Sequence, residues 1–142
     1  MPSVQVELDS KLPPAEVLKV LTDFGPSRAA VWPGVDQDHL TVHGQGDDWA
    51  EVTEGNTTTW ERERYFWDAA TGAVSATTTD SNVWGPGSGW EYKLTPSGTG
   101  SRVAVKLTRR GKGVKGRLLA ALLPLVGRSF LTRSLSGPLQ AG

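Results

Sequence analysis

Apolar and polar residues alternate at the start of the chain. Val4, Val6 and Leu8 are separated by polar residues, and a period of two is typical of a strand with one buried face. A helical pattern follows at residues 13–21, where two prolines precede four apolar residues on one side. Residues 27–31 are long enough for a further helical turn before a Trp-Pro-Gly stop. The beginning of the chain therefore predicts one strand and two short helices.

The middle of the chain consists of short runs of strand-forming residues. Gly, Pro, Asn or Asp bounds each run, and these residues favour turns. Trp90, Tyr92 and Leu94 alternate with Glu91 and Lys93, so their run has one apolar face. The spacing predicts an antiparallel meander of six strands. The six runs cover residues 40–42, 49–53, 57–67, 73–79, 89–94 and 102–108.

Residues 115–135 change to a helical period. A helix of this length extends about 30 Å, enough to cross a small sheet. We expect it to cover the apolar face of the sheet with one stripe of side chains. At about 100° per residue, that stripe consists of Leu119, Leu122, Leu123, Val126 and Phe130.

The orientation of the run at 57–67 stays open. Glu61 and Glu63 share one face of this strand, with Tyr65 and Trp67 on the same side. Two carboxylates about 7 Å apart are a possible acid–base pair. We expect the simpler alternative, a solvated ladder of charges between neighbouring strands.

The net charge of zero conceals an uneven distribution over the 142 residues. The first 100 residues hold six basic and fifteen acidic side chains, whereas the last 42 hold nine basic and none acidic. We expect the basic segment to pack beside the acidic one, so that the two fields largely cancel. The alternative is an exposed cationic strip for an anionic ligand, a lipid surface or RNA.

Several familiar motifs fail on inspection. Residues 111–116 match G-x-G-x-x-G, but no acidic residue follows Glu91, so a dinucleotide site is excluded and a flexible connector is favoured. His39 and His43 on one strand would lie about 13 Å apart, too far to share a metal ion. The chain has no cysteine, which excludes thiolate zinc sites and cysteine nucleophiles. The sequence thus predicts no metal and no cofactor.

Tryptophan is unusually frequent, with six residues against three phenylalanines. Each indole buries a large area and carries an N–H that needs a partner. Several of them facing one concave sheet favour a ligand site over a dry core. Trp32, Trp90 and Tyr92 are the aromatic residues that we expect to line such a site.

The order of elements and two local patterns resemble a known family. The opening Val-Gln-Val-Glu-Leu at 4–8, the helix start at 13–23 and the late Pro-Gly-Ser-Gly-Trp at 86–90 are similar to the START-like (SRPBCC) superfamily, in particular its single-domain bacterial proteins of the polyketide cyclase/dehydrase type. The resemblance covers residues 1–142 as one domain. It implies an α+β helix-grip fold: a seven-stranded antiparallel sheet, two short N-terminal helices, and a long C-terminal helix over a hydrophobic cavity.

Three functions stay open. The first is binding of a small hydrophobic or amphipathic molecule, such as a lipid, and the second is a cyclase-like enzyme acting in the same cavity. The third is an interaction protein that uses the basic C-terminal third; the lack of interleaved aromatic residues argues against nucleic acid, and the short apolar run at 118–126 argues against stable membrane insertion. The acidic start is unlike a signal peptide, so we expect a cytoplasmic protein. The expected ligand-binding residues are Trp32, Trp90, Tyr92, Leu94, Leu122, Val126 and Phe130.

Overall fold

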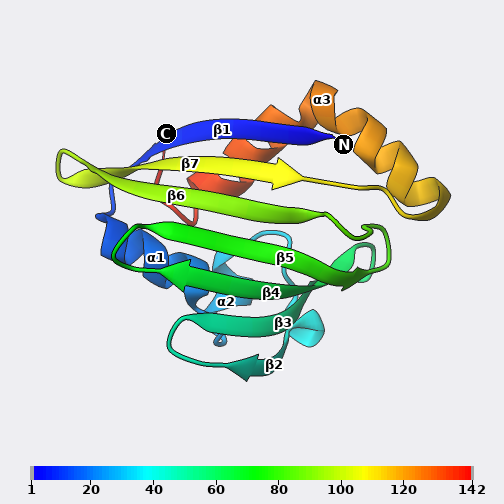
Figure 1. The fold of residues 1–142 in the computed structure, drawn as a ribbon, viewed down its shortest axis with the longest axis horizontal. Helices are drawn as coiled ribbons and strands as arrows, with labels where there is room; N and C mark the ends of the chain where they lie inside the picture. Colours follow the sequence, from blue (N-terminus) through cyan, green and yellow to red (C-terminus); the bar gives the residue numbers. More distant parts are fainter. Residues whose placement is uncertain (1, 142) are drawn as a thin grey trace.

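The computed structural model describes residues 2–141, which form one seven-stranded antiparallel sheet (Figure 1). The strand order is β1-β7-β6-β5-β4-β3-β2, so that only β1 lies away from its neighbours in sequence. This confirms the predicted sheet. The strands are β1 (Ser3–Ser10), β2 (Thr41–Gln45), β3 (Trp49–Gly55), β4 (Trp60–Asp68), β5 (Ala73–Ser81), β6 (Gly89–Ser97) and β7 (Gly100–Thr108).

Three helices and a short 3₁₀ turn complete the α+β helix-grip fold, as predicted. The helix α1 packs against β6 and β7, and α3 packs against β1 (Figure 1). After α3 the chain returns to β1, where the amide of Lys11 donates to the carbonyl of Gln140. The elements are α1 (Pro14–Thr22), α2 (Ser27–Val31), the 3₁₀ turn η1 (Gln37–His39) and α3 (Gly113–Ser136).

The core follows the alternation of the strands. In β6 and β7 every second side chain is buried, so Tyr92 and Leu94 pair with Val105 and Val103 on the inner face. The charged residues between them point outward. The apolar side chains of α1, chiefly Val17 and Leu21, join the same core.

The helix α3 turns a different face to the sheet from the one its hydrophobicity predicts. Leu122 and Val126 were expected to face inward, but both are about half exposed. Small residues explain the difference, because a Cβ on Gly127 would lie 2.6 Å from a methyl group of Val4 in β1, and a Cβ on Gly116 would lie 2.1 Å from the carbonyl oxygen of Val83 in the loop after β5. The helix packs closely where its residues are glycines. Leucines occur on both sides of the helix, so hydrophobicity alone does not show which side packs. The buried residues of α3 are Gly116, Ala120, Leu123, Gly127, Leu131 and Leu135.

The structure shows the orientation of β4, which the sequence left open. Glu61 and Glu63 point inward with Tyr65, whereas Arg62 and Arg64 lie on the outer face and pair with Glu51 of β3. The solvated ladder that we expected therefore holds for the outer face only. Arg62 pairs with Asp80 and Glu63 with Thr78, so the extra residue, Thr79, lies in β5 and β4 keeps its alternation.

The basic segment is partly neutralised by the acidic body. Within residues 2–141, three of its nine basic residues form salt bridges: Arg102 with Asp9, Arg109 with Glu61, and Lys112 with Asp80. The glycine motif at 111–116 is a tight joint where a Cβ on Gly111 would lie 2.6 Å from the Cα of Arg117. The ammonium groups of Lys112 and Lys115 donate to backbone carbonyls of Ser81 and Thr58.

Candidate functional site

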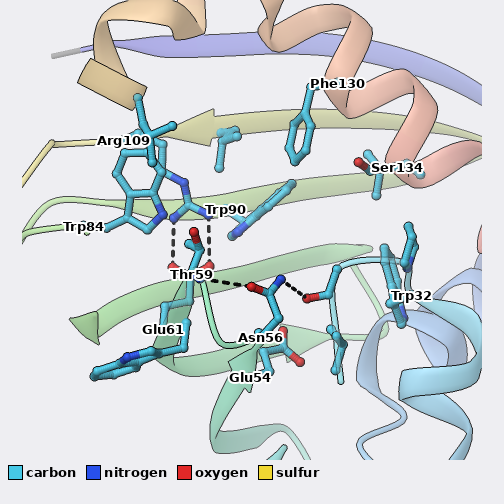
Figure 2. A pocket seen from close by; sticks show the side chains of 18 of the residues that line it. Trp32, Glu54, Asn56, Thr59, Glu61, Trp84, Trp90, Arg109, Phe130 and Ser134 are labelled. Atoms are coloured by element: carbon cyan, nitrogen blue, oxygen red, sulfur yellow. Dashed lines mark hydrogen bonds and ion pairs between the residues drawn. The ribbon is translucent and has the colours of Figure 1, made fainter. Parts of the chain in front are cut away.

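A cavity of about 410 Å³ lies between the inner face of the sheet and α3. The strands β3, β4, β6 and β7 form its floor, α3 forms its roof, and the segment after α2 closes one side (Figure 2). Four of the six tryptophans line it. They are Trp32, Trp60, Trp84 and Trp90, together with the aliphatic residues Leu107, Leu119, Leu123 and Leu135.

The structure brings four of the seven expected ligand-binding residues to this cavity. Trp32, Trp90, Tyr92 and Phe130 line it. Leu94 shares the face of Trp90 and Tyr92 but lies further along β6, where it is buried in the core. Leu122 and Val126 lie on the outer side of α3, as described above, and do not line it.

A charged pair lies among the indoles of the cavity. The two terminal nitrogens of Arg109 donate to the two carboxylate oxygens of Glu61, both over 2.9 Å (Figure 2). The guanidinium also lies over the rings of Trp84 and Trp90, at 4.8 and 5.4 Å from their centroids. Both charged side chains are largely buried, and a bidentate pair is among the strongest of protein hydrogen bonds. The cavity therefore offers a rigid polar wall between aromatic surfaces.

A second charged pair closes the opposite part of the cavity. Arg28, from α2, donates from Nε to Glu54 of β3 over 2.6 Å and from a terminal nitrogen to the hydroxyl of Tyr65 over 3.0 Å. The hydroxyl of Tyr65 in turn donates to Glu54 over 3.0 Å. Burial works to raise the pKa of Glu54, but the Arg28 guanidinium outweighs it and holds the pKa below its usual value. Glu54 is therefore an ionised anchor and a poor proton donor.

Glu63 lies on the same inner face of β4 but does not line the cavity. It is 1% exposed, and its Oε2 has no hydrogen-bond partner among residues 2–141. Burial, reinforced by the negative charges of Glu61 and Glu54, raises the pKa of Glu63 well above its ordinary value. The raised pKa favours the neutral form of this carboxyl in the fold.

The cavity is bounded at one end by two loops joined through an asparagine. The side-chain oxygen of Asn56 accepts a hydrogen bond from the amide of Thr59 over 3.0 Å, and its nitrogen donates to the carbonyl of Gly34 over 3.3 Å (Figure 2). Phe130 approaches from α3 and is half exposed while it lines the cavity. Asn56 thus links the two loops at this end of the cavity.

Sequence reasoning missed most of the polar groups of this site. Arg28 lies in a five-residue helix with no periodicity, and its partner Glu54 is 26 residues away. Arg109 was counted only as part of the basic segment. Glu61 was noted as a possible acid, and its inward orientation was the missing fact. The one usable signal was the pairing of acids with Tyr65 on one face of β4.

The chemistry available in the cavity is recognition by aromatic surfaces and fixed hydrogen-bonding groups. Each carboxylate that lines it, Glu54 and Glu61, is held by an arginine. His39 lies in η1 and His43 on β2, and neither lines the cavity. Residues 2–141 contain no group of three or more His, Asp or Glu side chains placed to hold a metal ion.

The structure defines the class of the protein as a helix-grip fold with an aromatic cavity between the sheet and the long helix. Residues 1–137 match the family described as "Polyketide cyclase / dehydrase and lipid transport". The chain belongs to this family. No curated protein sequence matches the chain significantly.

Solved structures with little sequence identity share the fold. A protein from Thermus thermophilus, TTHA0849, has a TM-score of 0.78 at 18% identity, with 98% of this chain and 95% of that chain covered. A START superfamily protein from Mycobacterium smegmatis has a TM-score of 0.75 at 11% identity, with 99% and 98% covered. The Zhui aromatase/cyclase from Streptomyces sp. R1128 has a TM-score of 0.73 at 13% identity, with 96% and 90% covered. The START-like resemblance noted from the sequence is confirmed.

Proposed function

We propose that this protein is a soluble, cytoplasmic binding protein for a small hydrophobic or amphipathic molecule, which it holds between the sheet and α3. The observation that carries the proposal is the cavity of about 410 Å³ with four indoles in its walls. Pockets for small molecules are typically about 300–1,000 Å³, mostly apolar, with a few fixed polar groups. This cavity has the same size and composition.

The polar groups indicate what kind of molecule fits. Arg109 and Glu61 already satisfy each other, so a ligand gains little by breaking their bonds. The flat surfaces of Trp84 and Trp90 beside them suit a planar or conjugated apolar body. We therefore expect a ligand that is mainly apolar and carries one or two hydroxyl or carbonyl oxygens.

Titration with an apolar fluorescent probe tests this proposal. N-phenyl-1-naphthylamine should gain fluorescence on binding and quench tryptophan emission, because four indoles line the cavity. Ser134 lines the cavity from α3, so Ser134→Trp should fill part of the space and abolish uptake. Thr132→Trp is the matched control, since Thr132 is exposed two residues away on the same helix and does not line the cavity.

The outcome depends on all three proteins. The proposal predicts saturable uptake by the wild type and by Thr132→Trp, and none by Ser134→Trp at equal stability. Probe binding that survives Ser134→Trp, or that disappears on Leu125→Ser at the exposed surface of α3, would assign the signal to another part of the molecule. Either result would overturn the proposal.

Catalysis in the same cavity is a second candidate, favoured by one observation. Glu61 lines the cavity, where its carboxylate accepts hydrogen bonds from the hydroxyl of Thr78 over 2.8 Å and from Arg109, so a carboxylate forms part of the cavity wall. The family description includes cyclase and dehydrase activities. If Glu61 transfers protons, Glu61→Gln should abolish conversion of a poly-β-ketone substrate, followed by mass spectrometry, while naphthylamine binding persists. Loss of both together would leave binding as the only function supported.

A further inference from the structure

The outer face of α3 carries most of the exposed large apolar side chains of the protein. Among residues 2–141, six of the nine such residues belong to this one helix. Val114, Leu118 and Leu125 are 78%, 64% and 80% exposed. We define the outer apolar face as Val114, Leu118, Leu122, Leu125 and Val126. At 100° per residue these five positions span about 120° of the helix, as wide as the apolar stripe of an amphipathic helix.

This face lies on the side of α3 that the core does not use. The opposite side includes Gly116 and Gly127, where an added Cβ would lie 2.1 Å from the carbonyl oxygen of Val83 and 2.6 Å from a methyl group of Val4 in β1, and it buries Ala120. A soluble helix normally has one apolar side, and α3 has two. Core packing therefore explains one of them and leaves the other without a partner in residues 2–141.

Basic side chains lie on and beside the outer apolar face, and no acidic residue follows Glu91 in the sequence. Lys115, Arg117 and Arg128 are exposed on α3 itself. At 100° per residue Arg117 and Arg128 lie beside one edge of the face, whereas Lys115 lies within its span. Neither Arg117 nor Arg128 forms a salt bridge within residues 2–141. An apolar stripe with basic residues along one edge is the pattern of a helix that lies in a membrane interface and attracts anionic lipids.

From this arrangement we propose that the outer apolar face of α3 docks on the surface of an anionic lipid bilayer. The helix has the length and hydropathy of a membrane span, but its inner side is held against β1, so it lies flat on the surface instead of crossing. A second copy of the chain is a poorer partner, because packing two α3 helices face to face brings basic residues of both chains into one interface.

Docking in this orientation has a consequence for the cavity. Phe130 and Leu119 line the cavity from α3, next to the outer apolar face along the same helix. Phe130 is also half exposed. The bilayer surface would thus meet the protein beside the cavity. This docking does not depend on the proposed ligand, since it rests on the outer side of the helix.

Vesicle flotation tests the docking with the full chain. Vesicles of phosphatidylcholine with 30% phosphatidylglycerol should bind the protein at least about tenfold more strongly than phosphatidylcholine alone, and raising NaCl from 0.05 to 0.5 M should weaken binding. Leu118→Ser with Leu125→Ser should reduce binding about tenfold or more. Arg117→Gln with Arg128→Gln should reduce it about fivefold per charge. Val42→Ser, an exposed apolar position on β2, is the matched control and should have no effect.

A second measurement locates the contact. The chain has no cysteine, so Leu125→Cys and Val42→Cys each give one site for an environment-sensitive NBD label. The label at 125 should shift to the blue with anionic vesicles, and the label at 42 should not. No binding to anionic vesicles, equal loss in Val42→Ser, or equal shifts at both labels would overturn the proposal. The proposal would also be overturned if the protein formed a dimer without vesicles and the double substitution Leu118→Ser with Leu125→Ser dissociated it. The face would then be an interface between two copies of the chain. Naphthylamine uptake without vesicles is unaffected by any of these results.

Discussion

Replacing Glu63 by glutamine should make the protein more stable relative to the wild type as the pH rises. Glu63 is buried on the inner face of β4, without a partner for its Oε2 within residues 2–141, and near the carboxylates of Glu54 and Glu61. Its pKa is therefore raised well above the ordinary value in the folded state. In the unfolded chain the same carboxyl titrates at about pH 4.3.

The sign and size of the effect follow from proton linkage. Between the unfolded and the folded pKa, the folded protein holds one proton more than the unfolded chain, so raising the pH favours unfolding. The contribution of Glu63 to stability is fully present below the unfolded pKa. It is lost at about 1.4 kcal/mol per pH unit as the pH rises toward the folded pKa. Glutamine stays neutral at every pH and removes this loss.

Urea denaturation at pH 5, 6 and 7 measures the effect. The free energy of unfolding of Glu63→Gln minus that of the wild type should increase by about 1.4 kcal/mol per unit while the pH remains below the folded pKa. Any free-energy cost of burying the glutamine amide does not depend on pH. Such a cost shifts the free-energy difference equally at all three pH values and leaves its slope against pH unchanged. Glu91→Gln, on the exposed outer face of β6, is the control and should give a flat difference. A flat difference for Glu63→Gln as well would show that the carboxyl is ionised in the fold and would refute the reasoning.

Two further predictions concern packing. Arg28→Met should lower the free energy of unfolding by about 3–5 kcal/mol, because it leaves Glu54 buried without its counter-charge. Urea denaturation of Arg28→Met, Glu54→Leu and the double variant should show strong coupling, and additive losses would contradict the pairing. Gly116→Ala should cost about 1–3 kcal/mol despite its higher helix propensity, since a Cβ there would lie 2.1 Å from the carbonyl oxygen of Val83. Ser129→Ala, exposed on the same helix, should be near neutral in thermal denaturation, and an equally tolerated Gly116→Ala would show that α3 does not approach the loop at Val83 so closely.

The sheet was predictable because alternation in antiparallel strands is a local property. The alternation around residues such as Tyr92 and Val105 shows within a few positions which face of the strand is buried. The turns between strands are marked by residues that favour turns. The long helix was predictable in its extent for the same reason. The orientation of the helix was not predictable, because leucines occur on both sides of α3. The glycines decide which side packs, and they give no signal in a hydrophobicity pattern.

The aromatic part of the site was predictable from composition, and the charged part was not. Trp32 and Trp90 reach the cavity as expected, because large indoles on the inner side of a sheet have few other places to go. Arg28 and Arg109 meet their carboxylates across 26 and 48 positions in sequence. Pairing over such separations depends on tertiary packing, which no local pattern encodes.

Native mass spectrometry tests most directly whether the cavity holds a small apolar molecule. The wild type, Ser134→Trp and Thr132→Trp would be incubated with a total lipid extract, separated from it by gel filtration, and sprayed under non-denaturing and denaturing conditions. The account predicts an added mass on the wild type and on Thr132→Trp that disappears on denaturation, and only the bare chain for Ser134→Trp. Bare chain in all three samples, or the same added mass on all three, would contradict it.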